Sequence, residues 1–427
     1  MRSKMKTTAT KEEATPALVP KLRFPEFREA AGWETTPLGE LGAIVTGKTP
    51  STKEDDLWGG EMLFITPTDI TEGERYQHTT QRTVVETRGT KVLPPGSVVY
   101  TCIASIGKMA LTVVPSVTNQ QINAVVPNGN TAREFIYYSL ANLTPWIKSI
   151  PATSTLPIIN KTQFSGFIIP HPEDKAEQQK IAECLSSVDE LMAAQARKVA
   201  VLKTHKKGLM QQLFPREGET QPRLRFPEFQ NAGEWEVTEL GSLSDVRDGT
   251  HDSPSFFQSG RPLVTSKNLR PDGTLDLENV SLISEEDYVQ INKRSKVSVG
   301  DILFGMIGTI GNPVLIKSEG FAIKNVALIK EVGPLSNAFL VQLLQSGYVA
   351  AIFAVLNTGN SQKFVALGKI RGLPIPVPSL PEQERIADCL SSLDALITAE
   401  TQKHGALKTH KKGLMQQLFP SPEEVKA

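Results

Sequence analysis

Residues 42–49, GAIVTGKT, have the spacing GxxxxGK[ST], which is typical of loops that bind nucleotide phosphates. Such a loop holds phosphates with the backbone N–H groups of small residues and then enters a helix. Here the middle positions are Ile44 and Val45, which favour a strand, and a proline follows the motif. We therefore predict a strand that runs into a polar loop. A nucleotide-binding protein that uses Lys48 and Thr49 is the alternative.

Other residue types that could support catalysis or bind a metal lack suitable neighbours. His205 and His410 stand among lysines, where one helical face offers no further ligand or base, so we expect solvated or interface histidines. The three cysteines form no CxxC pair, which argues against a zinc site or a disulfide framework and agrees with a cytoplasmic protein. We expect Cys184 and Cys389 to be small core residues. The chain is predicted to be non-catalytic, with no cofactor and no metal of its own.

Polar clusters in predicted loops carry the side chains that read DNA. Asn, Gln, Lys and Arg make paired hydrogen bonds to base edges, and Ser and Thr reach bases or phosphates. An ordinary solvated loop is the alternative at each position. The predicted DNA-contacting residues of the first half are Lys48, Thr49, Ser51, Lys53, Ser105, Lys108, Asn119, Gln120, Gln121, Ser154 and Thr155. Those of the second half are Thr250, His251, Ser253, Lys267, Asn268, Arg270, Lys324, Asn325, Asn360, Ser361, Gln362 and Lys363.

The overall charge limits how the chain could use these loops. It has 46 basic and 46 acidic residues, so its formal net charge is zero. A protein that binds nucleic acid unaided is usually basic, so neutrality favours binding together with a partner that supplies positive charge. No apolar run approaches the roughly 20 residues that a membrane span needs, so no membrane partner is expected.

The elements that must position the loops occur twice. Residues 202–215, LKTHKKGLMQQLFP, return unchanged at 407–420, and LRFPEF at 22–27 returns at 224–229. A period of about 200 residues is far longer than a solenoid repeat, so each copy is a whole domain with its own helix.

Between these repeated ends, each half has the pattern of an α+β domain. Short β-branched runs predict strands; they lie at 97–101, 111–114, 122–126, 301–304, 314–316 and 326–329. Helical spacing covers 133–143 in the first half and 337–353 in the second. Proline-rich exits at 167–172 and 373–378 are predicted to be extended.

Two long helices follow these exits. Apolar residues step by four and three, the seam of a coiled coil, from Ile181 to Leu213 and again from Ile386 to Leu418. Each helix starts acidic and ends basic, so antiparallel packing would place each acidic start against the other's basic end. Such a pair would relate the halves by a pseudo-twofold axis. Two separate helices, each packed on its own domain, are the alternative.

Several segments together carry a family resemblance. They are Thr46-Gly-Lys-Thr-Pro-Ser51 with Trp58-Gly-Gly60, Asp248-Gly-Thr-His-Asp-Ser-Pro254, EQQKIAECLSSVDELM, EQERIADCLSSLDALI and the two LKTHKKGLMQQLFP ends. With two domains alternating with two near-identical helices, the chain resembles the specificity subunit of Type I DNA restriction-modification enzymes over residues 21–420. The implied division is a flexible leader at 1–20, a target-recognition domain at 21–172, a spacer helix at 173–215, a linker at 216–223, a second target-recognition domain at 224–378, a second spacer helix at 379–420 and a tail at 421–427.

The resemblance also implies a function. Each recognition domain would read one half of a split, asymmetric site in double-stranded DNA, and the helices would set the spacer. Two adenine methyltransferase subunits would dock on the helices, with two restriction-translocase subunits as further partners. S-adenosylmethionine, ATP and magnesium would belong to those partners. A coiled-coil scaffold without a DNA role is a further alternative.

Overall fold

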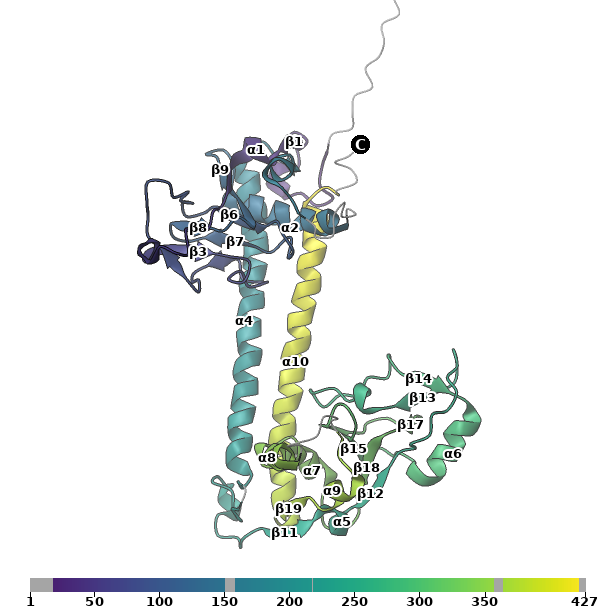
Figure 1. Ribbon diagram of the computed structural model, residues 1–427. Helices are drawn as coiled ribbons and strands as arrows, with labels where there is room; N and C mark the ends of the chain where they lie inside the picture. The colour runs from purple at the N-terminus through teal and green to yellow at the C-terminus, as the bar shows by residue number, and fades with distance from the viewer. Residues whose placement is uncertain (1–17, 150–157, 217, 357–363, 422–427) are drawn as a thin grey trace, which may run out of the picture. The chain divides into compact units, whose positions relative to one another are not determined.

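The duplicated sequence folds into two units of the same construction (Figure 1). The computed structural model describes residues 18–149, 158–216, 218–356 and 364–421. The first unit comprises Met1–Gln195 with Lys403–Ala427, and the second comprises Ala196–Gln402. Each unit therefore contains one globular domain, the first half of the long helix that follows this domain, and the last half of the other long helix.

The first unit is built on a five-stranded sheet of order β2-β9-β6-β7-β4 and a three-stranded sheet of order β5-β3-β8. Their strands are β2 (Gly42–Thr46), β3 (Trp58–Ile65), β4 (Tyr76–Gln77), β5 (Thr83–Val84), β6 (Val98–Thr101), β7 (Met109–Thr112), β8 (Ser116–Thr118) and β9 (Ile122–Pro127). A separate antiparallel pair joins β1 (Glu34–Pro37) to β10 (Ile168–His171). The helices are α1 (Leu38–Leu41), α2 (Arg133–Ser149), α3 (Lys161–Ser165) and the long α4 (Lys175–Leu213).

The second unit repeats most of this topology with different side chains, but its larger sheet has four strands instead of five. Its sheets have the orders β12-β18-β15-β16 and β14-β13-β17, and β11 pairs with β19. The strands are β11 (Glu236–Glu239), β12 (Asp245–Asp248), β13 (Arg261–Val264), β14 (Ser281–Ile283), β15 (Ile302–Gly305), β16 (Gly311–Leu315), β17 (Ala322–Ile323), β18 (Val326–Lys330) and β19 (Pro374–Val377). The helices are α5 (Leu240–Leu243), α6 (Glu285–Ser295), α7 (Asn337–Leu344), α8 (Gly347–Leu356), α9 (Leu367–Arg371) and the long α10 (Leu380–Leu418). The α+β class and the tandem arrangement are thus confirmed.

Two helix predictions need correction. The stretch 337–353 is not one helix: α7 ends at Leu344, and α8 starts at Gly347 after a bend of 57°. The predicted helix 133–143 continues through Pro145 to Ser149. The proline-rich exits are extended as predicted, because each forms a strand that pairs with the beginning of its own domain.

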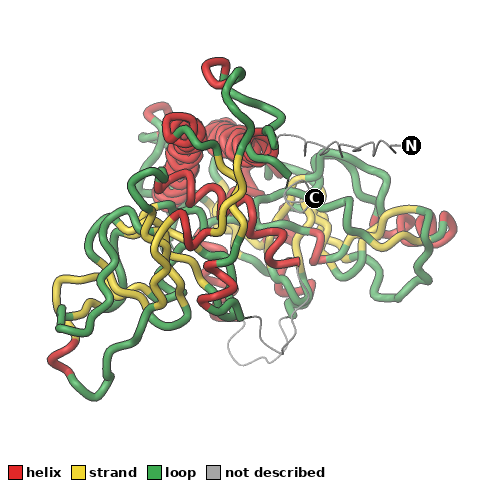
Figure 2. The backbone as a smooth tube through the Cα atoms, turned by 90° about the horizontal axis from the view of Figure 1, so that it is seen from above, coloured by secondary structure: helices red, strands yellow, loops and turns green. Residues whose placement is uncertain are grey.

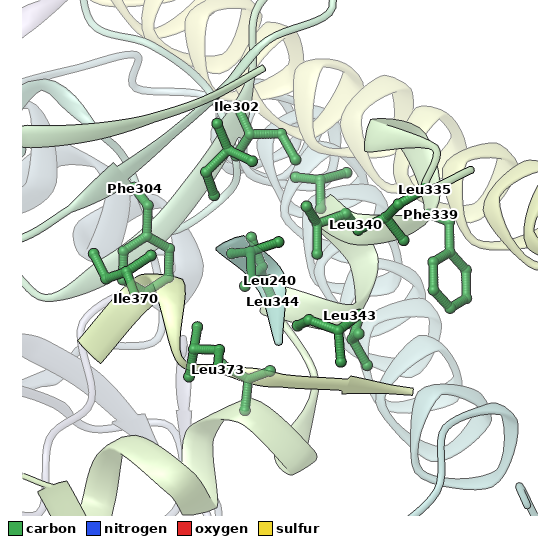
Figure 3. Close-up of a cluster of buried hydrophobic side chains, with 14 of the residues drawn as sticks. Leu240, Ile302, Phe304, Leu335, Phe339, Leu340, Leu343, Leu344, Ile370 and Leu373 are labelled. Carbon is green, nitrogen blue, oxygen red and sulfur yellow. The ribbon is translucent and has the colours of Figure 1, made fainter. Parts of the chain in front are cut away.

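Each domain core takes in the Leu-Phe end of a long helix. In the second unit, Phe339 belongs to the buried cluster of α5, β15 and α7 shown in Figure 3. Phe214 is part of the same cluster, and its ring centre lies 5.7 Å from that of Phe339. In the first unit, Phe419 packs 6.0 Å from Trp33 and 5.5 Å from Phe135. The repeated Leu-Phe-Pro therefore anchors the helix end in apolar surroundings. Burial of one such aromatic ring contributes about 2–3 kcal/mol.

The long helices run antiparallel within each unit. In the first unit, Lys411 of α10 lies 2.6 Å from Asp189 of α4. In the second unit, Lys206 of α4 lies 2.6 Å from Asp394 of α10, and Lys198 pairs with Glu400. Figure 2 shows these helices end-on as stacked red turns. The predicted seam is buried or half-buried along both helices, which excludes two helices that each pack only on their own domain. A coiled coil with strict knobs-into-holes packing stays a prediction.

The acidic helix starts bind a different partner from the one predicted. Glu177, near the start of α4, is bonded to Arg23 at 2.7 Å, and Glu382 of α10 is bonded to Arg225 at 2.6 Å. Each carboxylate is 1% exposed and each arginine 7%. The prediction considered only charges on the two helices. The arginines that pair with the glutamates belong instead to the repeated LRFPEF segment.

The same segment also binds the other helix. The backbone N–H of Leu22 donates to the carbonyl of Gln417 at the end of α10, and that of Leu224 donates to Gln212 at the end of α4. In each unit LRFPEF therefore joins the start of one long helix to the end of the other. We call this arrangement the arginine clamp: Arg23 with Glu177 in the first unit, Arg225 with Glu382 in the second.

The substitution Glu177→Gln tests the arginine clamp. It leaves the Arg23 guanidinium buried without a counter-charge, so we expect the free energy of unfolding of the first unit to fall by about 3–5 kcal/mol. Lys180→Ala is the control, because Lys180 lies on the same helix as Glu177 and pairs with Glu26 of the LRFPEF segment, with both side chains 47% exposed. That pair should be worth less than about 1 kcal/mol. Urea unfolding of the full chain measures both, and equal losses would contradict a special role for the clamp.

Candidate nucleic-acid interface

Three predicted loops of the first unit meet at the end of β2. The N–H of Lys48 donates to the carbonyl of Thr118 at 2.9 Å, and the N–H of Cys102 donates to that of Gln121 at 2.8 Å. The hydroxyl of Thr49 donates to the side-chain oxygen of Gln120 at 2.7 Å. The backbone thus brings the loops after β2, β6 and β8 to one edge of the sheet, as the polar clusters suggested.

The side chains in these loops differ in how exposed they are and in how many of their polar atoms remain free to contact a ligand. Those that are exposed and could contact a ligand are Lys48, Ser51, Lys53, Ser105 and Gln120. Thr49, Lys108 and Gln121 are half-buried, and the Lys108 ammonium donates to the carbonyl of Pro67 at 3.3 Å. Asn119 is 8% exposed, and its amide bonds to both the backbone and the side chain of Gln121. We therefore assign Asn119 to the support of the loop and leave it out of the proposed contact set.

The GxxxxGK[ST] motif is not a phosphate-binding loop. Residues 42–46 form β2, and after Lys48 the chain stays irregular until a short 3-10 helix at Asp55–Leu57, so no α-helix follows the lysine. Gly47 is there because of close backbone packing, since a Cβ at this position would lie 2.2 Å from the carbonyl oxygen of Thr118. The predicted strand and polar loop are confirmed, and nucleotide binding through Lys48 and Thr49 is excluded.

The equivalent loops of the second unit meet in the same way. The N–H of Thr250 donates to the carbonyl of Ile323 at 3.1 Å, and the N–H of Asn325 donates to the carbonyl of Thr250 at 3.2 Å. The Lys324 ammonium donates to the hydroxyl of Ser253. A Cβ on Gly249 would lie 2.4 Å from the carbonyl oxygen of Ile323, which repeats the constraint at Gly47.

A third loop of the second unit carries Lys267, Asn268 and Arg270. It is connected to the site because the hydroxyl of Ser266 donates to the carbonyl of Asn325 at 3.2 Å. Lys267 and Arg270 are exposed, and Arg270 is paired with Asp276 at 3.0 Å. Asn268 is 6% exposed, and its amide bonds to the backbone of Thr265 and Asn279, so it too supports its loop.

Six predicted residues lie outside the described parts of the chain. They are Ser154, Thr155, Asn360, Ser361, Gln362 and Lys363. The residues next to them on the chain are described. Ile158 bridges to Ile103 and is 53% exposed, and Phe364 bridges to Ile307 and is 47% exposed. These equivalent apolar side chains were missed because a search for polar clusters passes over them. They suit contact with a thymine methyl group.

Two basic residues near the first site were also missed. The Arg82 guanidinium lies 3.4 Å from the centre of the Trp58 ring, and the Trp58 indole N–H donates to the carbonyl of Ser51 at 3.0 Å. The Lys91 ammonium donates to the carbonyl of Thr46 at 3.2 Å. Both are isolated cations in the sequence, so only the fold reveals that they lie beside the polar loop.

Backbone strain concentrates in the same loops. Among the described non-glycine residues, positive φ angles occur at Ala104 (62°), Asn312 (46°) and Asn325 (56°). Ala104 lies in the β6–β7 loop, Asn312 is the second residue of β16, and Asn325 lies beside His251. Such strain costs about 1–3 kcal/mol per residue and is typical of sites where geometry serves binding.

His251 is the titratable centre of the second site. One ring nitrogen lies 2.8 Å from the amide oxygen of Asn325, and the other lies 2.8 Å from a carboxylate oxygen of Asp248. The hydrogen bond to Asn325 and then the bond to Asp248 raise the pKa of His251 above its ordinary value of 6.5, although the nearby Arg294 opposes this. The imidazolium form therefore persists to higher pH than in a solvated histidine and offers a positive charge.

Other kinds of site are limited by what the described residues contain. Within 18–149, 158–216, 218–356 and 364–421, no group of three His, Cys, Asp or Glu side chains could hold a metal ion. Across those same ranges, no single helix is long and apolar enough to cross a membrane; only the bent pair α7–α8 passes when its two parts are added. His205 and His410 are exposed, as expected. Cys184 and Cys389 are half-buried free thiols, and Cys184 packs at the edge of the first unit's core.

Comparison with known families agrees with this geometry. The family model described as "Type I restriction modification DNA specificity domain" matches residues 31–204 and again 232–409. The chain belongs to the Type I restriction-modification DNA specificity family. Its two matches cover the two domains and most of the two long helices, so the duplicated unit seen in the fold is the family's unit. A coiled-coil scaffold without a DNA role is thereby set aside.

Individual relatives support the same family. The chain is 25% identical over 425 residues to the MjaVIII specificity subunit of Methanocaldococcus jannaschii, covering 95% of both chains. It is 28% identical to the MjaIX specificity subunit of that organism over 264 residues, which is 56% of this chain and 58% of that relative. In fold it is similar to the S subunit of a Type I system from M. genitalium, with a TM-score of 0.60, 15% identity and coverage of 94% and 99%.

The substitution His251→Gln tests the charge at the second site. As pH rises through the raised pKa, His251 loses its proton and its attraction for DNA, so wild-type affinity should fall over a pH range that lies above the ordinary pKa of 6.5. The variant cannot titrate and should bind with nearly constant affinity. Lys48→Ala is the control, since it should lower affinity by a similar factor at every pH. Fluorescence anisotropy measures all three, and equal pH profiles for wild type and His251→Gln would contradict the assignment.

Proposed function

We propose that the chain is the sequence-reading subunit of a Type I restriction-modification complex and that each domain reads one half of a split, asymmetric DNA site. The main support is one loop scaffold built twice with different side chains. At its centre the first unit presents Lys48, Thr49 and Gln120, whereas the second presents Thr250, His251 and Asn325. Similar loop backbones with different donors and acceptors suit two unlike half-sites.

The proposed contact set follows from exposure and bonding. In the first unit it retains Lys48, Thr49, Ser51, Lys53, Ser105, Lys108, Gln120 and Gln121, and it adds Arg82, Lys91 and Ile158. In the second unit it retains Thr250, His251, Ser253, Lys267, Arg270, Lys324 and Asn325, and it adds Phe364. Exposed base-reading amides and cations would confer sequence preference, while Ser, Thr and lysine side chains would also contact phosphates.

The long helices are proposed as docking surfaces for two methyltransferase subunits. Leu191 of α4 is 58% exposed and Leu396 of α10 is 40% exposed. These leucines occupy equivalent positions, 205 residues apart, in otherwise polar helix faces. Scattered exposed leucines need no explanation, but a pair at one repeated position suits one partner that binds twice. A solved structure with a TM-score of 0.56 and 17% identity bears a title on complex assembly of the Type I system.

Catalysis would belong to those partners in the cytoplasm. The methyltransferases would bind S-adenosylmethionine and supply positive charge around the DNA, which agrees with the neutral net charge of this chain. Two restriction-translocase subunits would use ATP and magnesium. In this assembly the chain would determine only which sequence is modified.

Exchanging one domain tests the two-reader proposal. Replacing residues 22–170 by the corresponding domain of another specificity subunit should change one half of the recognised sequence, because the contact residues of the other half stay in place. Methylation-site sequencing of DNA treated with the reconstituted complex reads out both halves. The matched exchange of residues 224–376 should change only the other half. If either exchange altered both halves, the proposal would be wrong.

Lengthening the helices tests their proposed role as a spacer. We propose inserting seven residues after Arg197 in α4 and seven after Gln402 in α10. The ion pairs Asp189–Lys411 and Lys206–Asp394 between the helices then stay intact, because the first lies on one side of the insertions and the second lies on the other. The insertion lengthens each helix by about 10.5 Å. The spacer between the half-sites should therefore grow by about three base pairs at 3.4 Å each, again read by methylation-site sequencing.

A seven-residue insertion in the linker 216–223 is the control for the helix insertions and should leave the spacer unchanged. Positions near Glu177 are unsuitable for insertion, because they would break the arginine clamp. An unaltered spacer in a folded, active helix-insertion variant would show that the helices do not set the distance.

A further inference from the structure

A basic cavity lies within the second unit, between the end of α4 and the globular domain. Its volume is about 520 Å³, and three lysines of α4 line it: Lys203, Lys206 and Lys207. No Asp or Glu is among the lining residues. Lys206 is held by Asp394 at 2.6 Å, so its charge is largely balanced. Lys203 and Lys207 are exposed, and they give the cavity a positive potential that favours an anion.

The opposite wall of the cavity is the bend between α7 and α8. Ser346 directly precedes α8, and its carbonyl accepts a hydrogen bond from the N–H of Ala350 at 3.2 Å, as in the first turn of a helix. The N-terminus of this ten-residue helix therefore lies at the cavity, where backbone N–H groups and the helix dipole favour negative charge. Gly347 also lines the cavity, and a Cβ built on it meets no atom within 4 Å, so the space beside it is open.

A buried hydroxyl at this wall lacks a partner. Ser346 is 2% exposed, and its Oγ has no hydrogen-bond partner within the described structure. A buried hydroxyl without an acceptor lowers the stability of the fold by about 1–3 kcal/mol. Few such hydroxyls occur in native proteins unless water, an ion or a ligand supplies the missing partner. An anion placed against the start of α8 would supply the missing acceptor while the lysines neutralise its charge.

The first unit has the same lysines but not the same wall. The same sequence LKTHKKG occurs at 407–413, where Lys408, Lys411 and Lys412 are the equivalents of Lys203, Lys206 and Lys207. The equivalent helix α2 runs unbroken from Arg133 to Ser149, and Lys411 lies 5.3 Å from the centre of the Tyr138 ring on that helix. No helix begins at that position. The combination of lysines, helix start and unpartnered serine thus distinguishes the second unit.

We infer that this cavity binds a phosphate group of the DNA backbone. Its wall continues into the recognition loops: Pro271 follows Arg270, and the side chain of Asn312, also at the cavity, donates to the carbonyl of Leu269 at 2.9 Å. A duplex held by Lys267 and Arg270 would therefore run past the cavity. A phosphate contact of this kind fixes the register of the duplex and carries no sequence information. The inference rests on the proposed DNA-reading function.

The double variant Lys203→Ala, Lys207→Ala tests this inference in the complex with the methyltransferase subunits. DNA affinity should fall by about tenfold, both for a duplex with the recognised site and for an unrelated duplex. The slope of log affinity against log salt concentration should decrease by about 0.9 for one lost phosphate contact. The methylated sequence should not change. The matched control is Lys408→Ala, Lys412→Ala, the same substitution in the same repeated sequence, which should keep the wild-type slope.

A second variant, Ser346→Ala, tests the wall independently of the lysines. The hydroxyl that it removes has no hydrogen-bond partner within the described structure, so the melting temperature should not fall, whereas a bound phosphate would lose one donor and DNA affinity should fall by about fivefold. Titration of the full chain with inorganic phosphate, followed by ³¹P NMR, shows whether free phosphate also binds. Binding of free phosphate without any change in DNA salt dependence would mean a small-anion site and would overturn the inference.

The remaining outcomes separate the two proposals. An unchanged salt slope in the lysine double variant, together with an unchanged DNA affinity in Ser346→Ala, would overturn the phosphate site while leaving sequence-specific methylation intact. Equal loss of methyltransferase binding in the cavity double variant and in its control would show that the lysines bind protein, which also overturns it. If the wild-type complex showed no sequence preference at all, the proposed function itself would fail.

Discussion

The arginine clamp is the interaction on which the rest of each unit depends. Removing a charge from water is expensive, so a buried arginine–glutamate pair persists only when both groups are fully bonded. Arg23 meets both oxygens of Glu177 and also donates to the carbonyls of Ala30 and Ala31. Arg225 does the same with Glu382, Ala232 and Gly233. The clamp fixes where each long helix starts relative to its domain. The end of the other long helix is held in the core of the same domain by Phe419 in the first unit and by Phe214 in the second.

This construction separates what must stay constant from what must vary. The glutamine after each clamp glutamate is also buried: Gln178 and Gln383 accept from the backbone N–H groups of Ala132 and Ser336. The Glu-Gln pair, LRFPEF and Leu-Phe-Pro are therefore repeated for structural reasons that hold whatever partner binds. The loops after β2 and before β9 and their equivalents meet few such demands, chiefly Gly47, its equivalent Gly249 and the loop-supporting Asn119. They can carry different side chains on one backbone, which is what two different DNA readers require.

Small differences between otherwise matching units have chemical consequences. The equivalent helices α2 and α7–α8 cover the same part of each domain, but only the second is broken. The break creates a helix N-terminus beside three lysines, and the same lysine sequence in the first unit has no such neighbour. Identical residues thus acquire different chemistry from the backbone that they face.

The sequence by itself determined the class, the duplication, the two long helices with their antiparallel sense, and the central strands of the larger sheet in each unit. These features follow from periodicity and repetition, which are local and visible along the chain. It also pointed to the loops that we propose as DNA contacts, because Lys48, Gln120, Thr250 and Asn325 lie in polar stretches next to predicted strands.

Only the tertiary structure decided which of those side chains are available and what else surrounds them. Asn119 and Asn268 carry amides that could read bases, but these amides form hydrogen bonds within their own loops. Arg82 and Ile158 lie near the proposed contact loops although they belong to distant segments of the chain. The clamp joins residues about 150 positions apart, and the break at Ser346 occurs inside a run of helical spacing. Hydrogen bonds and burial between remote segments leave no periodic trace in a sequence, so these features could be recognised only once the chain was folded.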